Sequence, residues 1–373
     1  MIVELLIKLF VLIHAILFVW IVINSLFLPS LKQKRNQFVH PSVSILIPLR
    51  NEARNVKPLV ESLKKLDYPS LSFYFLDDDS TDQTYDLLFN ETKGLQNSVI
   101  LKGQELPNSW TGKVFACHQL SQAVRDSELY CFIDADVRLT SSSIRQAVQL
   151  LKKENAGLLT GFPAFPVTSL LSKLLVPMQH FVVFLHLPIF LANRSTFPAA
   201  TAAHGAFMLF DRLSYLEAGG HEAVKSSLVE DVQLAMLMKK KGANVILTNI
   251  TSFVTCHMYE TNQEVWNGFK KNIFNGLGRS ILLSLFIILF YFLFYLVPFV
   301  FPFLTGFTSI GAYLPILFIF LQRLLVDVVT KQKAWLFIMM PFSSFMLICL
   351  LFEAMRAYFF GAGYEWKQRI YRK

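Results

Sequence analysis

The sequence predicts an α/β protein in which a Rossmann-like, mostly parallel sheet is joined to transmembrane helices at both ends. Apolar runs of strand length alternate with amphipathic stretches through residues 41–275, which is typical of βαβ units. Long runs without a charged residue precede and follow this region. Carboxylates stand directly after several of the apolar runs, where the C-terminal edge of a parallel sheet binds ligands.

The composition contains more apolar residues than a soluble domain needs. Hydrophobic residues make up 54% of the chain and charged residues 16%, against about 45–50% and about 25% in soluble proteins. The net charge is +9. Because the basic residues cluster beside apolar runs, anionic lipid headgroups explain this charge better than nucleic acid does. The four cysteines form no C-x-x-C pair and have no zinc spacing, which predicts buried, reduced thiols.

The first element is a retained membrane anchor. Residues 9–31 contain no Asp, Glu, Lys or Arg, and about 20 apolar residues cross a bilayer. The basic cluster Lys32-Gln-Lys-Arg35 comes after the run. A cleaved signal peptide would carry its charge first and end in small residues. We therefore predict an N-terminal transmembrane anchor at residues 1–35, with its C-terminal end in the cytoplasm.

Residues 41–275 are the polar part of the chain and are predicted to form one α/β domain. Strands are expected in four apolar runs, at residues 43–47, 73–76, 98–101 and 129–133. The stretches between them, ending near Leu66, Lys93 and Arg125, have helical character. The carboxylates that follow the second and fourth strands should therefore gather at one edge of the sheet.

The fourth strand ends abruptly in Asp134-Ala-Asp136, a D-x-D motif. Two carboxylates this close repel each other unless a positive charge lies beside them. A hard divalent cation, Mg²⁺ or Mn²⁺, carrying a diphosphate is the natural counter-charge. The alternative is an exposed turn after a strand, since Asp is common in turns.

Residues 174–193 are apolar and uncharged but contain Pro177 and Pro188. Their length would allow one crossing. A crossing would separate acidic groups on either side that we expect to serve one site. We therefore predict an interfacial helix or a re-entrant hairpin in the headgroup layer. The alternative is a buried helix of the soluble domain.

The C-terminal region, residues 280–373, is predicted to be transmembrane with a basic tail. Residues 280–322 contain no charged residue and fit two crossings, and residues 334–352 form a further apolar run. Three crossings after a cytoplasmic domain would leave the basic tail, residues 367–373, outside. Either residues 334–352, which Pro341 interrupts, are re-entrant, or the positive-inside rule fails there.

Five motifs follow one another in residues 41–275: Pro48-Leu-Arg-Asn-Glu52, Asp77-Asp78-x-Ser80-x-Asp82-x-Thr84, Asp134-Ala-Asp136, Gly219-Gly220-His221 and Glu230-Asp231. In this order they resemble the membrane-bound glycosyltransferases of family 2, which have the GT-A fold. Two further motifs resemble the branch of that family that acts on carotenoid acids, hopanoids and related terpenoid lipids. They are Trp110-Thr-Gly-Lys113-x-x-x-Cys117, and His257-Met-Tyr259 with Trp266.

The resemblance implies a role for each residue that binds the donor. Asp136 would hold the Mg²⁺ or Mn²⁺, and Asp134 would reach the ribose or the water shell of the metal. Asp77 or Asp78 would accept a hydrogen bond from the nucleotide base. Lys113 is a candidate for the diphosphate oxygens, the alternative being a solvated loop lysine. The remaining residues would shape the nucleotide pocket, namely Pro48, Arg50 and Glu52.

The resemblance also implies which residue acts as the base. Asp231 would take the proton of the acceptor as it attacks the anomeric carbon, so that the configuration inverts in one displacement, and Glu230 would orient it. The alternative for this pair is capping of a helix N-terminus. His204 and His221 could contact phosphate or acceptor, or be structural.

The resemblance implies transfer of a single sugar from a UDP-sugar to a membrane lipid, with a carotenoid or terpenoid as the expected acceptor. Residues 263–266 read Gln-Glu-Val-Trp, without the Arg of the Q-x-x-R-W pattern of polymerising synthases. We expect a multi-pass protein of the cell membrane with its catalytic domain in the cytoplasm. The alternatives are a polyprenyl-phosphate or ceramide-type glycosyltransferase and an inactive membrane binding protein of the same fold. A channel or transporter would want ionisable residues within its spans, and the apolar runs hold almost none.

Overall fold

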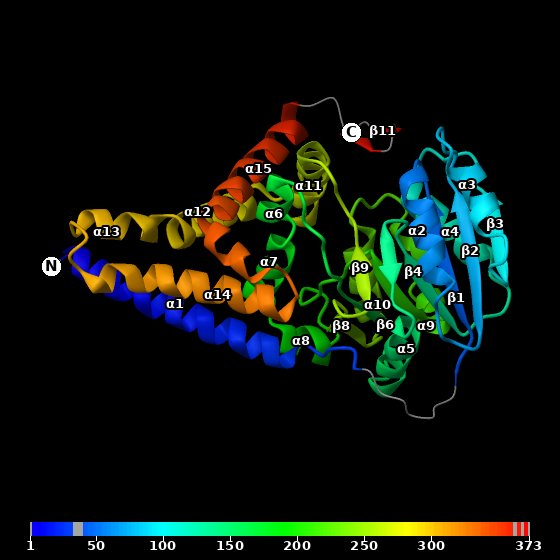
Figure 1. The fold of residues 1–373 in the computed structure, drawn as a ribbon, viewed down its shortest axis with the longest axis horizontal. Coiled ribbons are helices and arrows are strands. Elements are labelled where there is room, and N and C mark those ends of the chain that lie inside the picture. Colours follow the sequence, from blue (N-terminus) through cyan, green and yellow to red (C-terminus); the bar gives the residue numbers. More distant parts are fainter. Residues whose placement is uncertain (1, 33–39, 361–363, 367–368, 372–373) are drawn as a thin grey trace. The chain divides into compact units, whose positions relative to one another are not determined.

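The computed structural model describes residues 2–32, 40–360, 364–366 and 369–371 (Figure 1). The chain divides into two compact units. The sheet unit consists of Leu28–Ala164 and Leu187–Met258. The helical unit consists of Met1–Phe27, Phe165–His186 and Tyr259–Lys373.

The sheet unit is built on a seven-stranded sheet with the strand order β3-β2-β1-β4-β7-β6-β8. The pairs β1–β2, β2–β3, β1–β4 and β6–β8 are parallel, and β7 is antiparallel to both of its neighbours. The predicted α/β class with a mostly parallel sheet is therefore confirmed. The strands are β1 Val43–Leu49, β2 Leu71–Asp77, β3 Ser98–Lys102, β4 Leu129–Ile133, β6 Leu158–Phe162, β7 Phe207–Asp211 and β8 Val245–Asn249.

Helices of the sheet unit pack against the central strand β4. All five residues of β4 are buried, as expected of a central strand. Tyr130 and Phe132 of β4 share a buried cluster with residues of α4 and α10, including Val114 and Leu234. A small two-stranded sheet pairs β5 Val137–Leu139 with β9 Val254–Cys256. The helices are α2 Ala53–Leu63, α3 Thr84–Glu91, α4 Gly112–Ala123, α5 Ser143–Lys153, α8 Ile189–Arg194, α9 Arg212–Glu217, η1 Gly220–Val224 and α10 Glu230–Lys240.

The helical unit contains four stretches that are long and apolar enough to cross a membrane, among the residues that the structure describes. They are Ile2–Phe27, Ile281–Leu304, Ile310–Val329 and Ala334–Phe360. The elements are α1 Ile2–Phe27, α6 Leu170–Leu175, α7 Met178–His186, α11 Asn262–Gly276, α12 Ile281–Tyr295, η2 Val297–Val300, α13 Phe301–Leu304, η3 Ile310–Tyr313, α14 Leu314–Val329, η4 Ala334–Met339, α15 Met340–Phe360, and the pair β10 Tyr364–Trp366 and β11 Arg369–Tyr371.

The predicted domain boundaries and membrane topology stay predictions. The last apolar stretch has 27 residues, which is the length of a full crossing. The predicted orientation in the membrane depends on two basic clusters, at residues 32–35 and 367–373. Most residues of these clusters lie outside the described residues.

Residues 174–193 form three short helices instead of one long one. Pro177 lies between α6 and α7, and Pro188 lies between α7 and α8, because proline cannot continue the hydrogen-bonding pattern of a preceding helix. Each helix is shorter than the roughly 20 residues that a crossing needs. The predicted interfacial position of this segment stays a prediction.

A buried ion pair lies inside α14 of the helical unit. Nε of Arg323 is 2.9 Å from Oδ1 of Asp327, and neither side chain is accessible. The expectation that the spans hold almost no ionisable residue fails for this stretch, because the uncharged run was counted only to Gln322. The two charges are one helical turn apart and neutralise each other, so the pair by itself indicates no ion pathway.

Candidate active site

The predicted acidic residues lie at the C-terminal edge of the parallel strands. Pro48 is near the end of β1, Asp77 ends β2, and Asp134 follows β4 directly. The register aligns Leu49 with Asp77, so that the two strands end together. This edge is where open α/β sheets bind their ligands.

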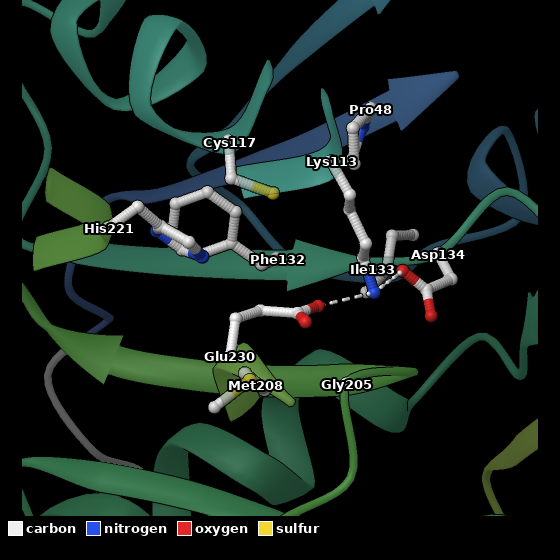
Figure 2. Close-up of a pocket in the computed structure, with 10 residues that line it drawn as sticks. All are labelled: Pro48, Lys113, Cys117, Phe132, Ile133, Asp134, Gly205, Met208, His221 and Glu230. Carbon is white, nitrogen blue, oxygen red and sulfur yellow. Dashed lines mark ion pairs between the residues drawn. The ribbon is translucent and has the colours of Figure 1, made fainter. Parts of the chain in front are cut away.

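Lys113 is the cation that joins two of these carboxylates (Figure 2). Its Nζ is 2.8 Å from Oδ1 of Asp134 and 2.9 Å from Oε1 of Glu230. Lys113 and Glu230 each lie in the first turn of a helix, α4 and α10 respectively. A small pocket surrounds the pair of contacts. Its lining consists of Pro48, Lys113, Cys117, Phe132, Ile133, Asp134, Gly205, Met208, His221 and Glu230.

The charges around Lys113 hold it in the ammonium form. Burial alone would lower the pKa of Lys113, but the negative charges of Asp134 and Glu230 raise that pKa well above its usual value. Burial raises the pKa of Asp134, and the Lys113 ammonium counteracts part of this rise. The site therefore keeps one fixed positive charge among several carboxylates.

Replacing Lys113 with Met should remove this charge and leave Asp134 and Glu230 facing each other. We expect the rate of transfer to fall by about 10²-fold or more, as when a preorganised donor is removed from an active site. Lys93→Met is the matched control, because Lys93 is exposed and belongs to the same unit. The transfer rate is measured with a saturating donor. A wild-type rate in Lys113→Met, as in Lys93→Met, would contradict this role.

Asp231 lies beside Glu230 and is held by main-chain donors. Its Oδ2 accepts a hydrogen bond from the N–H of Gly205 at 2.9 Å, and its Oδ1 accepts one from the N–H of Val232 at 2.8 Å. Burial, followed by the charge of Glu230, raises the pKa of Asp231 to about 6. Lys113 and the two N–H groups limit the rise. A carboxylate with this pKa can accept a proton near neutral pH.

Asp136 is the other end of the D-x-D motif. Its carbonyl accepts from the N–H of His257 at 2.9 Å, and its Oδ1 accepts from the thiol of Cys256 at 3.6 Å. Burial raises the pKa of Asp136 to about 7, and the charges of Asp134 and Glu52 add to this. A buried carboxyl group with a raised pKa is typical of a site where a bound cation supplies the compensating positive charge.

The donor set fits a cation shared with a substrate. Among the described residues there is no group of three or more His, Cys, Asp and Glu side chains that could hold a metal ion alone. Mg²⁺ in particular is commonly held by one or two carboxylates together with substrate phosphates. Asp136, with Asp134 two residues away, meets that requirement.

The acidic motif Asp77-Asp78 lies at the end of β2, next to the end of β1 on the same edge of the sheet. Asp77 is 7% exposed, and its Oδ1 is a buried acceptor without a protein partner among the described residues. Its Oδ2 accepts from the N–H of Ser80 at 3.3 Å. Asp78 is buried, and its N–H donates to the carbonyl of Leu49. Glu52 accepts a hydrogen bond from the amide of Asn55 at 2.7 Å.

The structure thus brings Lys113, Asp134 and Glu230 into direct contact. Asp231 adjoins Glu230 in the first turn of α10. The motif residues of β1 and β2, with Glu52 just after β1, lie along the same edge.

Sequence reasoning missed the residues that hold these groups. Gly205 donates to Asp231, Cys256 to Asp136, and Arg138 to the amide oxygen of Asn55 at 2.8 Å. These contacts join residues far apart in the chain, and no local pattern marks them. His204 binds Thr160 of β6 through its backbone, with N–H to Oγ1 at 3.0 Å. Burial lowers the pKa of His204 to about 4, so its side chain is neutral at physiological pH.

The seven-stranded, mostly parallel sheet has the GT-A fold of glycosyltransferases. The solved structure of the mannosyltransferase PcManGT from Pyrobaculum calidifontis, in complex with GDP-Man and Mn²⁺, has the same fold. The likeness has a TM-score of 0.55 at 15% identity and covers 96% of this chain and 99% of that one.

The family follows from the sequence match. The model described as Glycosyl transferase family 21, a family 2-like group, matches residues 5–370. The chain belongs to this glycosyltransferase family, which confirms the class expected from the motifs.

Relatives agree with the predicted branch. The 4,4'-diaponeurosporenoate glycosyltransferase of Staphylococcus haemolyticus (strain JCSC1435) is 24% identical over 261 residues, or 68% of this chain. The protein of the same name from Staphylococcus aureus (strain MRSA252) is 23% identical over 252 residues, or 67% of this chain. The match spans 65% of the length of each of these relatives.

Proposed function

We propose that the protein is an inverting glycosyltransferase that moves one sugar from a UDP-sugar to a carotenoid or terpenoid lipid. The observation that carries this proposal is the contact of Lys113 with Asp134 and Glu230, with Asp231 beside Glu230, at the ligand-binding edge of a glycosyltransferase sheet. The acceptor class is supported by the name of the staphylococcal relatives, which act on a carotenoid acid.

The donor would bind along the edge formed by β1, β2 and β4. The unpartnered oxygen of Asp77 suits an N–H of the nucleotide base, with Asp78 as the neighbouring acceptor. Pro48 and Glu52 would shape the nucleotide pocket. The ammonium group of Lys113 has three N–H donors. Two of them point to Asp134 and Glu230, so one remains for a diphosphate oxygen.

Asp136 is the residue that would hold Mg²⁺ or Mn²⁺. When bound there, the cation supplies positive charge that neutralises the leaving diphosphate. Asp134 would contact the ribose or a water on the metal.

The reaction itself is a single displacement. The acceptor oxygen bonds to the anomeric carbon while the bond from that carbon to the diphosphate oxygen breaks, and the electron pair leaves with the diphosphate. Asp231 takes the proton of the acceptor hydroxyl. Glu230, fixed by Lys113, keeps Asp231 in place. Attack opposite the leaving group inverts the configuration.

The helical unit would keep the chain in the cell membrane, where a lipid acceptor is dissolved. Its four apolar stretches are those of a multi-pass protein. We propose that the sheet unit faces the cytoplasm, where nucleotide sugars are made. The partners are then the nucleotide-sugar donor, the lipid acceptor and the membrane.

Comparison of cellular lipids tests the proposed function. Lipids would be extracted from cells producing the wild-type chain or the Asp231→Asn variant and analysed by mass spectrometry. We expect a hexose or N-acetylhexosamine increment on a terpenoid lipid in the wild type alone. An increment on polyprenyl phosphate or ceramide would overturn the acceptor class, and no increment on any lipid would favour an inactive binding protein.

The rate should depend on pH through Asp231. Because the folded protein raises the pKa of this carboxyl to about 6, the base form is lost as pH falls through 6. We expect kcat/KM to be constant from pH 7 to 8 and to fall about tenfold per unit well below pH 6. The measurement uses saturating Mn²⁺, so that titration of Asp136 does not contribute. A profile that stays flat down to pH 5 would contradict the role of Asp231.

A further inference from the structure

The Gly219-Gly220-His221 motif places one imidazole in the wall of the active-site pocket. Gly219 and Gly220 adopt φ angles of +85° and +54°. A Cβ on Gly220 would lie 2.8 Å from the ring of Tyr215. The two glycines therefore let the backbone approach Tyr215 closely, and His221 follows at once, with 2% of its surface exposed.

Tyr215 fixes the ring of His221 through one nitrogen. The Tyr215 hydroxyl accepts a hydrogen bond from the N–H of His221 at 3.1 Å and lies 2.8 Å from Nδ1. We assign the hydroxyl hydrogen to Nδ1, which leaves the ring hydrogen on Nε2. Burial lowers the pKa of His221 to about 3, so the ring stays neutral. Phe132 packs against the ring with centroids 4.6 Å apart.

Tyr215 contacts Nδ1, so the other ring nitrogen, Nε2, is the one left for a group in the pocket that the ring lines (Figure 2). Glu230 and Lys113 supply the charged groups of the same wall, and Cys117, Phe132 and Met208 supply apolar groups. The cavity has a volume of about 10 Å³, which is room for about one water-sized group. It can take one hydroxyl group and is too small for a sugar ring.

We propose that His221 and Glu230 together seat one hydroxyl group of the transferred sugar. A hydroxyl group can accept from Nε2–H and donate to the carboxylate of Glu230 at the same time. The proposal deepens the proposed function, on which it rests: the donor carries a free hydroxyl at one ring position, and His221 is a residue that selects for it. Asp231 adjoins Glu230, so the seated sugar stays next to the base.

The test compares His221→Phe with the wild type on a set of donors. Phe keeps the packing on Phe132 and Tyr215 but removes both ring nitrogens. The parent donor is the one that the wild type uses among UDP-glucose, UDP-galactose, UDP-N-acetylglucosamine and GDP-mannose. The other donors are analogues of this parent, each lacking the hydroxyl group at one ring position. His118→Phe is the matched control, since His118 lies on α4, packs against Trp110 with the two rings tilted, and does not line the pocket.

We expect the wild type to lose about 10–100-fold in kcat/KM with one of the deoxy donors. His221→Phe should lose a similar factor with the parent donor and show little further loss with that analogue, while His118→Phe behaves as the wild type. Binding of the nucleoside diphosphate alone should be unchanged. Should His221→Phe not fold, Tyr215→Phe, which frees the ring, should weaken discrimination at the same position.

Two results overturn the proposal in different ways. If His221→Phe keeps the full discrimination at every position, or loses nucleoside diphosphate binding and all donors equally, His221 is only structural. If the wild type transfers no sugar from any donor to lipid, the proposed function fails first and this inference fails with it.

Discussion

Asp136→Ala should abolish sugar transfer while the protein still folds and inserts. Asp136 is the residue proposed to hold the cation, and without that cation the leaving diphosphate has no counter-charge. We expect the rate to fall by at least about 10³-fold and not to recover at high Mn²⁺. The rate is measured in detergent with the donor labelled in its sugar. Asp126→Ala is the matched control, because Asp126 is an exposed residue of the same unit.

The stability of this variant separates a binding role from a structural one. The fold raises the pKa of Asp136 to about 7, so the folded state binds the proton more tightly than the unfolded chain does. Ionised Asp136 therefore destabilises the metal-free protein above pH 7. In the metal-free protein above pH 7, Asp136→Ala should therefore leave the midpoint of thermal unfolding unchanged or raise it. A clear decrease in that midpoint would show that Asp136 supports the fold.

Asp231→Asn should give the second largest loss. Asn has the same shape and can accept from the N–H of Gly205, but it cannot take a proton. We expect kcat to fall by about 10²–10⁴-fold with the KM of the donor unchanged, which is the usual contribution of a general base. Asp86→Asn, an exposed change on α3, is the matched control. Near-full turnover by Asp231→Asn would show that another group is the base.

The sequence predicted the first half of the sheet well, because four strands stand out as apolar runs between turn residues. Strand β7 was not among them. Its residues, Phe207–Asp211, follow an apolar and glycine-containing stretch, and nothing in the periodicity gives the direction in which a short buried strand runs. Pairing with β4 and β6, which is a long-range property, decides that it is antiparallel.

The site was predictable where a carboxylate directly follows a strand, since strand ends meet at one edge. The partners of Lys113 were not predictable, because its contacts with Asp134 and Glu230 require three elements to pack together. Gly205 carries no side chain to signal that its N–H binds Asp231. The neighbourhood of His221 depends on Tyr215, which only the structure brings close.

The structure of the protein with Mn²⁺ and a non-transferable UDP-sugar analogue, in which carbon replaces the glycosidic oxygen, tests the central claim most directly. We expect the cation to bind Asp136 and the diphosphate, and the uracil ring to lie near Asp77 or Asp78. The anomeric carbon should face Asp231. A nucleotide bound away from this edge, or a cation held without Asp136, would contradict the account.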